Sequence, residues 1–420
     1  MFVVPDPGFR PQVMIAQKDL AWWVEQPETI VSARGPQVGR FAINYLSPTL
    51  DHTHDGYMIE MIRKDFTRSI GKLQPEVFAD LKEAADRHLY SQSGNWHEVS
   101  LWKTMEQIVF KSTLQMFVGY SLSRDDGFVR AVATFASCLG AGAIIVGQLM
   151  PPVIKPVVGY TMAIPVWFAQ KWAFSYLMPE AKVRIDNLRR KRSDSNFKWE
   201  EPKDMMMWMV RTAMDRKDPK LNPFYIAERI LFLVSRISPR RNSVSANTCQ
   251  SKMLGAIHTT IMTGTNMMLD LLSSPAENDY YAALRQEADS VFLTPSDWES
   301  HAHVMRLNLA DSTLRETLRK NPVLTRSVLR EVIAPDGLVF PDGQHLKKGT
   351  WVGIPSVGVH HDENIYARPQ LYDPFRFVPK PKASTDEMGN PMGPQKPSRP
   401  EGLSTASDTY LAFGYGRHSW

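Results

Sequence analysis

The stretch Phe413-Gly414-Tyr415-Gly416-Arg417-His418-Ser419-Trp420 decides how the rest of this chain is interpreted. Its two glycines allow the backbone to turn where a side chain would clash, and its aromatic residues offer flat apolar surfaces. Arg417 and His418 add a positive charge and an ionisable ring. Together these residues predict a loop that brings its backbone close to a flat, anionic group.

The composition around this loop is that of an ordinary globular protein. The 420 residues are 43% hydrophobic and 22% charged, so the chain is long enough to bury a substantial core. The net charge of +5 is mild, and basic residues are scattered rather than set in a stripe with aromatic residues, so we expect no nucleic-acid partner. Cys138 and Cys249 are too few for a disulfide framework or a cysteine metal cluster, which favours a reducing compartment.

The sequence also bears on how the chain meets a membrane. Residues 1–6 have neither the basic region nor the apolar region of a signal peptide. Residues 131–151 are apolar and long enough for a membrane span, but they contain three glycines, end in a proline pair and have no strongly basic flank. These features favour a buried helix, or one that lies on a membrane surface, over a true span.

Hydrophobic periodicity predicts a mainly α-helical chain. Apolar residues recur every three to four positions in early segments, and two apolar segments then flank a proline-rich hinge at 151–156. Near residue 330, alternating residues and Pro-Asp-Gly turns predict short strands. The expected helices are 57–73, 78–89, 101–118, 181–192, 203–216, one that starts at 226–233, 253–272 and one that contains Glu316. The expected strands are 328–333 and 338–340.

Two segments interrupt this pattern. Residues 234–252 are polar, contain Pro239 and show no helical period, so they predict an irregular insert within a helical region. Residues 380–408 begin with a stretch rich in Pro, Gly, Ser and Lys, which predicts a flexible surface loop.

Three small motifs are candidates for chemistry. Glu316 and Arg319 stand three apart on a predicted helix, so their side chains meet, although such a pair alone indicates only a weak surface ion pair. The run 258–260, His-Thr-Thr, lies in an apolar helix, where a Thr usually bonds to the preceding turn and a lone His is usually a core residue. His360 and His361 are adjacent rather than spaced like metal ligands, so we expect no metal there.

In their order along the chain, these motifs resemble the cytochrome P-450 superfamily of haem-thiolate monooxygenases. The final stretch is similar to its haem-binding loop, Phe-x-x-Gly-x-(Arg or His)-x-Cys, and Glu316-x-x-Arg319 followed by 375–377, Phe-Arg-Phe, is similar to its Glu-x-x-Arg helix and later loop. Residues 256–260, Ala-Ile-His-Thr-Thr, resemble the distal helix of fungal ent-kaurene-oxidase-like members. The resemblance implies a mainly α fold with small β-sheets, in one domain over residues 1–420.

The resemblance also implies a role for each candidate site residue. Arg319 and Arg376 would clamp Glu316 under the haem loop as a structural triad. Thr259 would deliver protons during catalysis, and His258 stands where the family usually has a carboxylate. The residues implied to contact haem b are Phe413, Gly416, His418 and Arg63.

The iron-ligating cysteine of the family would fall at position 420, where this sequence has Trp420. An indole N–H is a donor with no lone pair to offer, so we expect no metal ligand there and no monooxygenation by the chain as written. The resemblance also starts inside the family fold, so we expect a member that is truncated at both ends. A retained intron after the first two bases of a Cys codon would produce this end, and Val234-Ser235 is consistent with a second retained intron.

The function that the resemblance implies is hydroxylation of a lipophilic terpenoid or polyketide in fungal secondary metabolite biosynthesis. Electrons would come from NADPH-cytochrome P-450 reductase, at the cytosolic face of the endoplasmic reticulum membrane, with membrane-surface contact as an open possibility. Two alternatives stay open at this point. One is a non-catalytic remnant or pseudoenzyme that binds a hydrophobic ligand, and the other is an unrelated helical protein of the membrane surface.

Overall fold

The computed structural model describes residues 1–6, 8, 10–46, 65–89, 98–219, 221–235, 256–378, 384–385, 391–392 and 402–416. These residues form two compact units, which we describe separately. The first unit comprises Met1–Ile261 and Val328–Ile354, and the second comprises Met262–Ser327 and Pro355–Ser419. The single domain expected for residues 1–420 stays a prediction.

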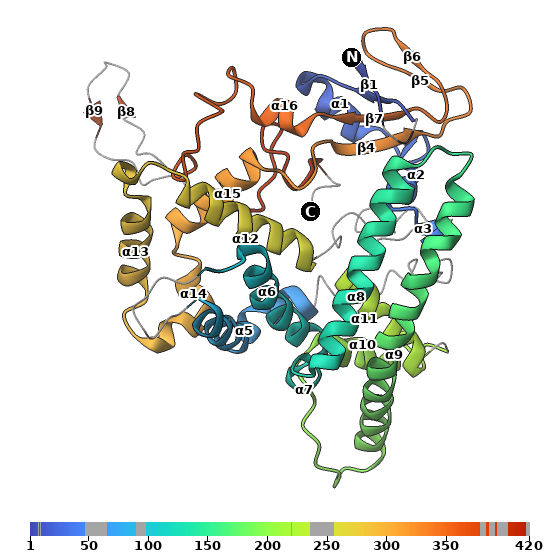
Figure 1. The fold of residues 1–420 in the computed structure, drawn as a ribbon, viewed down its shortest axis with the longest axis vertical. Coiled ribbons are helices and arrows are strands. Elements are labelled where there is room, and N and C mark those ends of the chain that lie inside the picture. Colours follow the sequence, from blue (N-terminus) through green and yellow to red (C-terminus); the bar gives the residue numbers. More distant parts are fainter. Residues whose placement is uncertain are drawn as a thin grey trace. The chain divides into compact units, whose positions relative to one another are not determined.

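Helices dominate both units and the sheets are small, which confirms the mainly α class (Figure 1). In the first unit the helices are α1 (Leu20–Glu25), α2 (Arg34–Phe41), α3 (Ile43–Leu46), α5 (Thr67–His88), α6 (Leu101–Val118), α7 (Tyr120–Ser123), α8 (Asp126–Gly142), α9 (Lys155–Ser193), α10 (Met205–Asp215) and α11 (Pro223–Ser235). Helix α12 (Ala256–Leu272) begins in the first unit and ends in the second, which also holds α13 (Tyr280–Val291), α14 (His301–Val304), α15 (Asn308–Lys320) and α16 (Ser356–His360). Short 3-10 helices cover Gln17–Asp19, Ala276–Asn278 and Pro295–Glu299.

The core of the first unit forms where α8 packs along α9 and α11. Helix α8 starts at an N-cap, because Asp125 accepts a hydrogen bond from the Phe128 amide at 2.9 Å. Phe128, Val132 and Phe135 recur at helical spacing and are fully buried. A wider π-helical segment, Ala143–Leu149, continues α8, and together they are long and apolar enough to cross a membrane, although 44% of that apolar window is buried inside the protein.

Two helices are longer than the sequence predicts. Helix α5 continues through Pro75, although separate helices at 57–73 and 78–89 were expected, and α9 continues through Pro165 and Pro179. A proline inside a helix removes one hydrogen bond and costs about 3 kcal/mol. Burial of the core faces of α5 against α6, and of α9 against α8 and α11, outweighs that cost.

The larger sheet joins strands from both ends of the sequence in the order β1-β2-β7-β4-β3. Strands β2 and β7 are parallel, with Gln12 opposite Trp351, while β1 with β2 and β3 with β4 are antiparallel. The expected turns are confirmed, since Gly337 and Gly343 have φ of 77° and 84°, which glycine tolerates. The strands are β1 (Phe2–Val4), β2 (Gln12–Met14), β3 (Val31–Ser32), β4 (Ser327–Val332), β5 (Leu338–Val339), β6 (His345–Leu346), β7 (Trp351–Ile354), β8 (Ser384–Thr385) and β9 (Pro391–Met392).

The two irregular segments lie largely outside the described residues. Val234 and Ser235 end α11, and the rest of the expected insert, to residue 252, is not among the described residues. Within the expected loop 380–408, the described parts are the antiparallel pair β8–β9 and residues 402–408.

A glycine pair tests the packing of the first unit. A Cβ at Gly147 would overlap the backbone carbonyl of Arg40 at the end of α2, whereas a Cβ at Gly140 would meet no atom within 4 Å. We expect Gly147→Ala to lower the free energy of unfolding by about 1–3 kcal/mol, because backbone has to move. Gly140→Ala should raise it by roughly 0.5–1 kcal/mol, because alanine favours a helix over glycine. Urea denaturation of both variants checks this, and equal effects would contradict the packing.

Candidate functional site

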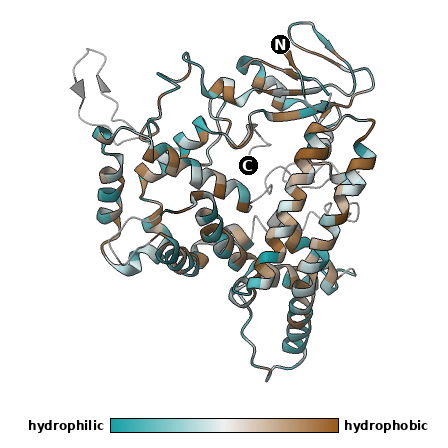
Figure 2. Ribbon diagram, viewed as in Figure 1, coloured by the Kyte–Doolittle hydropathy of each residue, from teal (hydrophilic) through white to brown (hydrophobic). Residues whose placement is uncertain are grey.

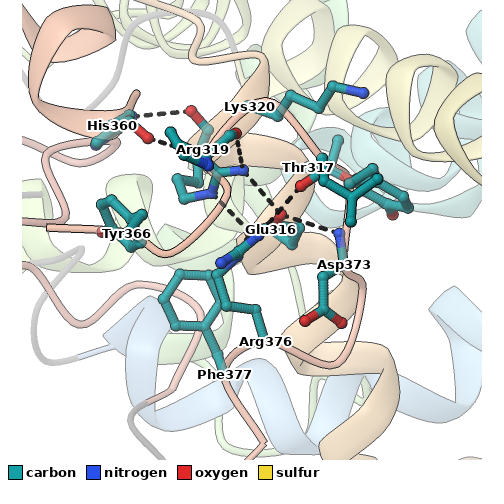
Figure 3. Close-up of polar contacts among 12 residues, drawn as sticks. Glu316, Thr317, Arg319, Lys320, His360, Tyr366, Asp373, Arg376 and Phe377 are labelled. Carbon is teal, nitrogen blue, oxygen red and sulfur yellow. Dashed lines mark hydrogen bonds and ion pairs between the residues drawn. The ribbon is translucent and has the colours of Figure 1, made fainter. Parts of the chain in front are cut away.

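Helix α15 sets Glu316 and Arg319 three residues apart, so both side chains lie on one face of the helix. Both are fully buried. The Arg319 guanidinium donates from Nε to Glu316 Oε2 at 2.7 Å and from Nη2 to Oε1 at 2.8 Å (Figure 3). This bidentate geometry fixes the orientation of the Glu316 carboxylate, and the guanidinium neutralises its charge.

A second arginine reaches the same carboxylate from a distant part of the chain. Arg376 donates from Nε to Glu316 Oε2 at 3.0 Å, and the Asp373 amide donates to Oε1 at 3.1 Å (Figure 3). Each oxygen of Glu316 therefore accepts two hydrogen bonds. The structure thus brings the three residues of the expected triad together within the second unit.

Both guanidinium groups also donate to backbone carbonyls. Arg319 donates to the carbonyls of His360 at 2.5 Å and Pro369 at 2.8 Å. Arg376 donates to the carbonyls of Ala367 at 2.8 Å and Leu371 at 3.1 Å. Since a buried cation is costly unless its donors are satisfied, these bonds hold the irregular segment between residues 360 and 376 against α15.

Aromatic rings and a third arginine hold the segment that precedes the 413–416 loop. The Arg315 guanidinium lies 4.3 Å from the centre of the Tyr410 ring and 4.8 Å from that of Phe377, and its Nη1 donates to the Gly402 carbonyl at 2.9 Å. The Tyr366 hydroxyl donates to the Thr409 carbonyl at 3.0 Å. Burial raises the pKa of Tyr410, so its phenol stays neutral.

The loop itself has the backbone that the glycines predict. Gly414 and Gly416 have φ of 82° and 67°, a region that favours glycine. The Gly414 amide donates to the Leu411 carbonyl at 3.0 Å, which closes a turn, and Phe413 is partly buried. His418 and Trp420 lie outside the described residues, so their expected positions stay predictions.

His258 and Thr259, the residues that resemble the distal helix of the family, belong to the first unit and lie at the start of α12. His258 is exposed and Thr259 is partly buried. Crowding by protein atoms, which removes hydration, lowers the pKa of His258, and the charge of Glu106 opposes this. The ring is therefore neutral at neutral pH. Arg63 lies outside the described residues, so its expected position stays a prediction.

The role of His360 does not follow from the sequence, which predicts only that this residue and His361 hold no metal. The ring is fully buried, with Nδ1 3.0 Å from the Arg319 carbonyl oxygen and Nε2 accepting from the Leu411 amide at 2.8 Å. Burial is the main cause that lowers the pKa of His360 to about 3. A bridging histidine leaves no pattern in the sequence, because its partners are backbone groups.

The residues around the loop fit a haem only in part. The two glycine turns have the positive φ expected of a loop whose backbone approaches a flat ligand. Position 420 does not fit an iron ligand, because an indole N–H has no lone pair to donate.

The neutral state of His360 predicts a specific dependence of stability on pH. An unfolded histidine binds a proton below about pH 6.5, whereas the folded ring does so only near pH 3. The stability that the neutral ring contributes is therefore complete above about pH 6.5 and is lost progressively as the pH falls towards 3. From about pH 7 to about pH 5, the wild type should lose roughly 2 kcal/mol more unfolding free energy than His360→Gln, which does not titrate. Urea denaturation at both pH values measures the difference, and equal losses would contradict a neutral His360.

Comparisons with known proteins agree with this geometry. The cytochrome P-450 family model matches residues 238–419. The chain is 29% identical over 428 residues to the cytochrome P-450 monooxygenase polB of Polytolypa hystricis, with all of this chain and 75% of that protein covered. It is 31% identical over 423 residues to the cytochrome P-450 monooxygenase lnaC of Aspergillus flavus, with all of this chain and 74% of that protein covered.

A solved structure has the same fold. Retinoic acid-bound cyanobacterial CYP120A1 superposes with a TM-score of 0.60 at 16% sequence identity, over 97% of this chain and 77% of that one. The Glu316–Arg319–Arg376 triad, the glycine turns at residues 414 and 416, and the similarity of this whole chain to about three quarters of two fungal monooxygenases all indicate the same family. The chain belongs to the cytochrome P-450 family.

Proposed function

We propose that this protein is of the type that hydroxylates a lipophilic terpenoid or polyketide in fungal secondary metabolism, with electrons from NADPH-cytochrome P-450 reductase. The observation that carries this proposal is the similarity of the whole chain to fungal proteins named cytochrome P-450 monooxygenases. Bound haem b would supply oxygen activation. The chain itself would bind and orient the haem and the substrate, and would move protons.

Specific residues take these roles in the proposal. Phe413 and Gly416 would lie against the haem, and His418 and Arg63 would pair with its propionates. The Thr259 hydroxyl would donate a proton towards the site of oxygen binding. A neutral His258 offers one donor and one acceptor, so it would orient a hydrogen-bonded proton path without the charge of a carboxylate.

Trp420 limits this function in the chain as written. Thiolate donation tunes haem iron for oxygen activation, and an indole cannot replace a thiolate. We therefore expect this sequence to lack monooxygenase activity. The alternative, a non-catalytic protein that binds hydrophobic ligands, is favoured by this same residue.

A carbon monoxide difference spectrum of the reduced protein tests the role of position 420. The chain as written should show no thiolate-type Soret band after haem is supplied, because it lacks the ligand. Trp420→Cys should show that band, and a conservative control, Trp420→Phe, should not. A thiolate-type band from the unaltered chain would overturn the proposed inactivity. A Trp420→Cys protein that takes up haem and still gives no such band would overturn the assignment of position 420.

We place the protein at the cytosolic face of the endoplasmic reticulum membrane, and one helix face supports contact with the membrane surface. Along α9, Val157, Tyr160, Ile164 and Trp167 recur at spacings of three and four and are 51% to 72% exposed. From Val157 to Trp167, this stripe extends about 15 Å along the helix. Figure 2 shows α9 changing from hydrophobic to hydrophilic colours along its length.

Charge favours a lipid surface over a second protein as the partner of this stripe. No carboxylate side chain occurs between Asp126 and Glu180, while Arg130, Lys155 and Lys171 are all positive. Tyrosine and tryptophan rings favour the level of the lipid headgroups, and basic residues favour anionic lipids. Charges of both signs often flank the apolar seam of a helix pair, and residues 127–179 contain no acidic side chain.

Vesicle flotation tests the stripe. The double variant Val157→Glu/Ile164→Glu should lower binding to vesicles of phosphatidylcholine and phosphatidylserine by at least about tenfold, because each apolar side chain loses burial worth roughly 1.5 kcal/mol or more. Leu293→Glu alters an equally exposed apolar residue outside the stripe and should leave binding unchanged. Equal binding of wild type and double variant would contradict the proposed contact.

A further inference from the structure

The ring of His360 joins two backbone groups that are far apart in the sequence. His360 ends α16, and its ring lies between the Arg319 carbonyl, at 3.0 Å, and the Leu411 amide, at 2.8 Å. All three residues belong to the second unit. The ring therefore bridges the end of α15 and the segment that leads into the 413–416 loop.

The two contacts fix the protonation of the ring. A backbone N–H can only donate, so Nε2 of His360 carries no proton where it meets Leu411. A backbone carbonyl can only accept, so Nδ1 carries the proton that it donates to Arg319. A protonated ring would lose the acceptor for Leu411. The bridge thus requires one donor and one acceptor in a neutral group.

On the α15 side, His360 and Arg319 hold each other at two points. The helix ends at Lys320, so the Arg319 carbonyl is among the last four, which lack a partner within the helix. The His360 ring supplies that partner, and Arg319 Nη1 donates in return to the His360 carbonyl at 2.5 Å. Because Glu316 fixes the same guanidinium, the position of His360 depends on the buried ion pair.

On the loop side, Leu411 is fixed at both of its backbone groups. Its amide donates to His360, and its carbonyl accepts from Ser327 Oγ at 3.1 Å and from the Gly414 amide at 3.0 Å. Leu411 is fully buried, and the Tyr410 ring stacks on the His360 ring with centres 5.7 Å apart. The turn at Gly414 therefore starts from a residue that His360 holds in place.

We propose that His360 is a positioning residue, which fixes the start of the 413–416 loop to the Glu316–Arg319 ion pair through the amide of Leu411. Its effect on haem binding rests on the proposed function, in which this loop faces the haem. His361 provides a matched control, because its Nδ1 lies 2.9 Å from the Val357 carbonyl of the adjoining helix α16 and its side chain is partly exposed.

Hydrogen–deuterium exchange of the full chain without haem tests the bridge directly. His360→Leu should speed exchange in the peptide that contains the Leu411 amide by about tenfold, since that buried amide loses its acceptor. His360→Asn, which is neutral but shorter, should have a similar effect and serves if the leucine variant does not fold. His360→Gln offers a donor and an acceptor on a side chain longer than that of asparagine. It should return the exchange rate at Leu411 to within about threefold of wild type. His361→Leu should leave it unchanged.

Two results would overturn the inference. One is unchanged exchange at Leu411 in both His360→Leu and His360→Asn, and the other is an equal increase in His360→Leu and His360→Gln. Haem titration in a Trp420→Cys background then separates the inference from the proposed function. Weaker haem binding with His360→Leu, restored by His360→Gln, supports both. Faster exchange at Leu411 with unchanged haem binding supports the bridge and contradicts the haem-facing role of the loop.

Discussion

The second unit depends on one buried carboxylate that has to be neutralised where water cannot reach it. Removing an unpaired charge from water is prohibitively costly, so Glu316 is stable only with Arg319 and Arg376 in contact with it. Two arginines overcompensate one carboxylate, and the excess positive charge is met by backbone carbonyls between residues 360 and 371. The irregular segment that supplies these carbonyls is thereby held without regular secondary structure. His360 extends the same network to Leu411, where the 413–416 loop begins.

The first unit is stabilised in a different way. Its core consists of apolar faces on α6, α8, α9, α10 and α11, including the methionine run Met205–Met207, and dispersion and hydrophobic burial dominate there. A buried ion pair between Arg184 and Asp204, at 2.5 Å, resembles the Glu316–Arg319–Arg376 triad on a smaller scale. Arg184 also donates to the Val118 carbonyl at 2.7 Å, and Asp204 caps α10 at the Met207 amide, so the pair ties the end of α6 to α9 and α10. Polar contacts here join helices that hydrophobic packing already holds.

The parts of this structure that the sequence predicts are those set by local rules. The spacing of Glu316 and Arg319 predicts their contact on α15. Alternating residues and the two Pro-Asp-Gly turns predict the strands near 328–333 and 338–340. Arg376 is 60 residues from Glu316, so no periodicity indicates their contact, and only a family resemblance suggested it. Only residues 181–192 of α9 were expected to be helical, because periodicity takes no account of the long-range packing that keeps Lys155–Ser193 continuous. His360 was missed because a residue that binds backbone groups on two distant segments has no local signature.

The most direct test of this account is a double-mutant cycle on Glu316 and Arg376, with unfolding free energies measured by urea denaturation. If the buried carboxylate organises the second unit, Glu316→Ala and Arg376→Ala should be coupled by at least about 2 kcal/mol, because Glu316→Ala leaves both arginines without their carboxylate, whereas Arg376→Ala removes one of the two cations that contact it. The exposed pair Arg285 and Asp289 supplies a control cycle, in which solvent screening should leave the effects of the two single variants additive within the error of the measurement. Additive effects of the Glu316 and Arg376 variants, to within about 0.5 kcal/mol, would contradict the central role of the clamp.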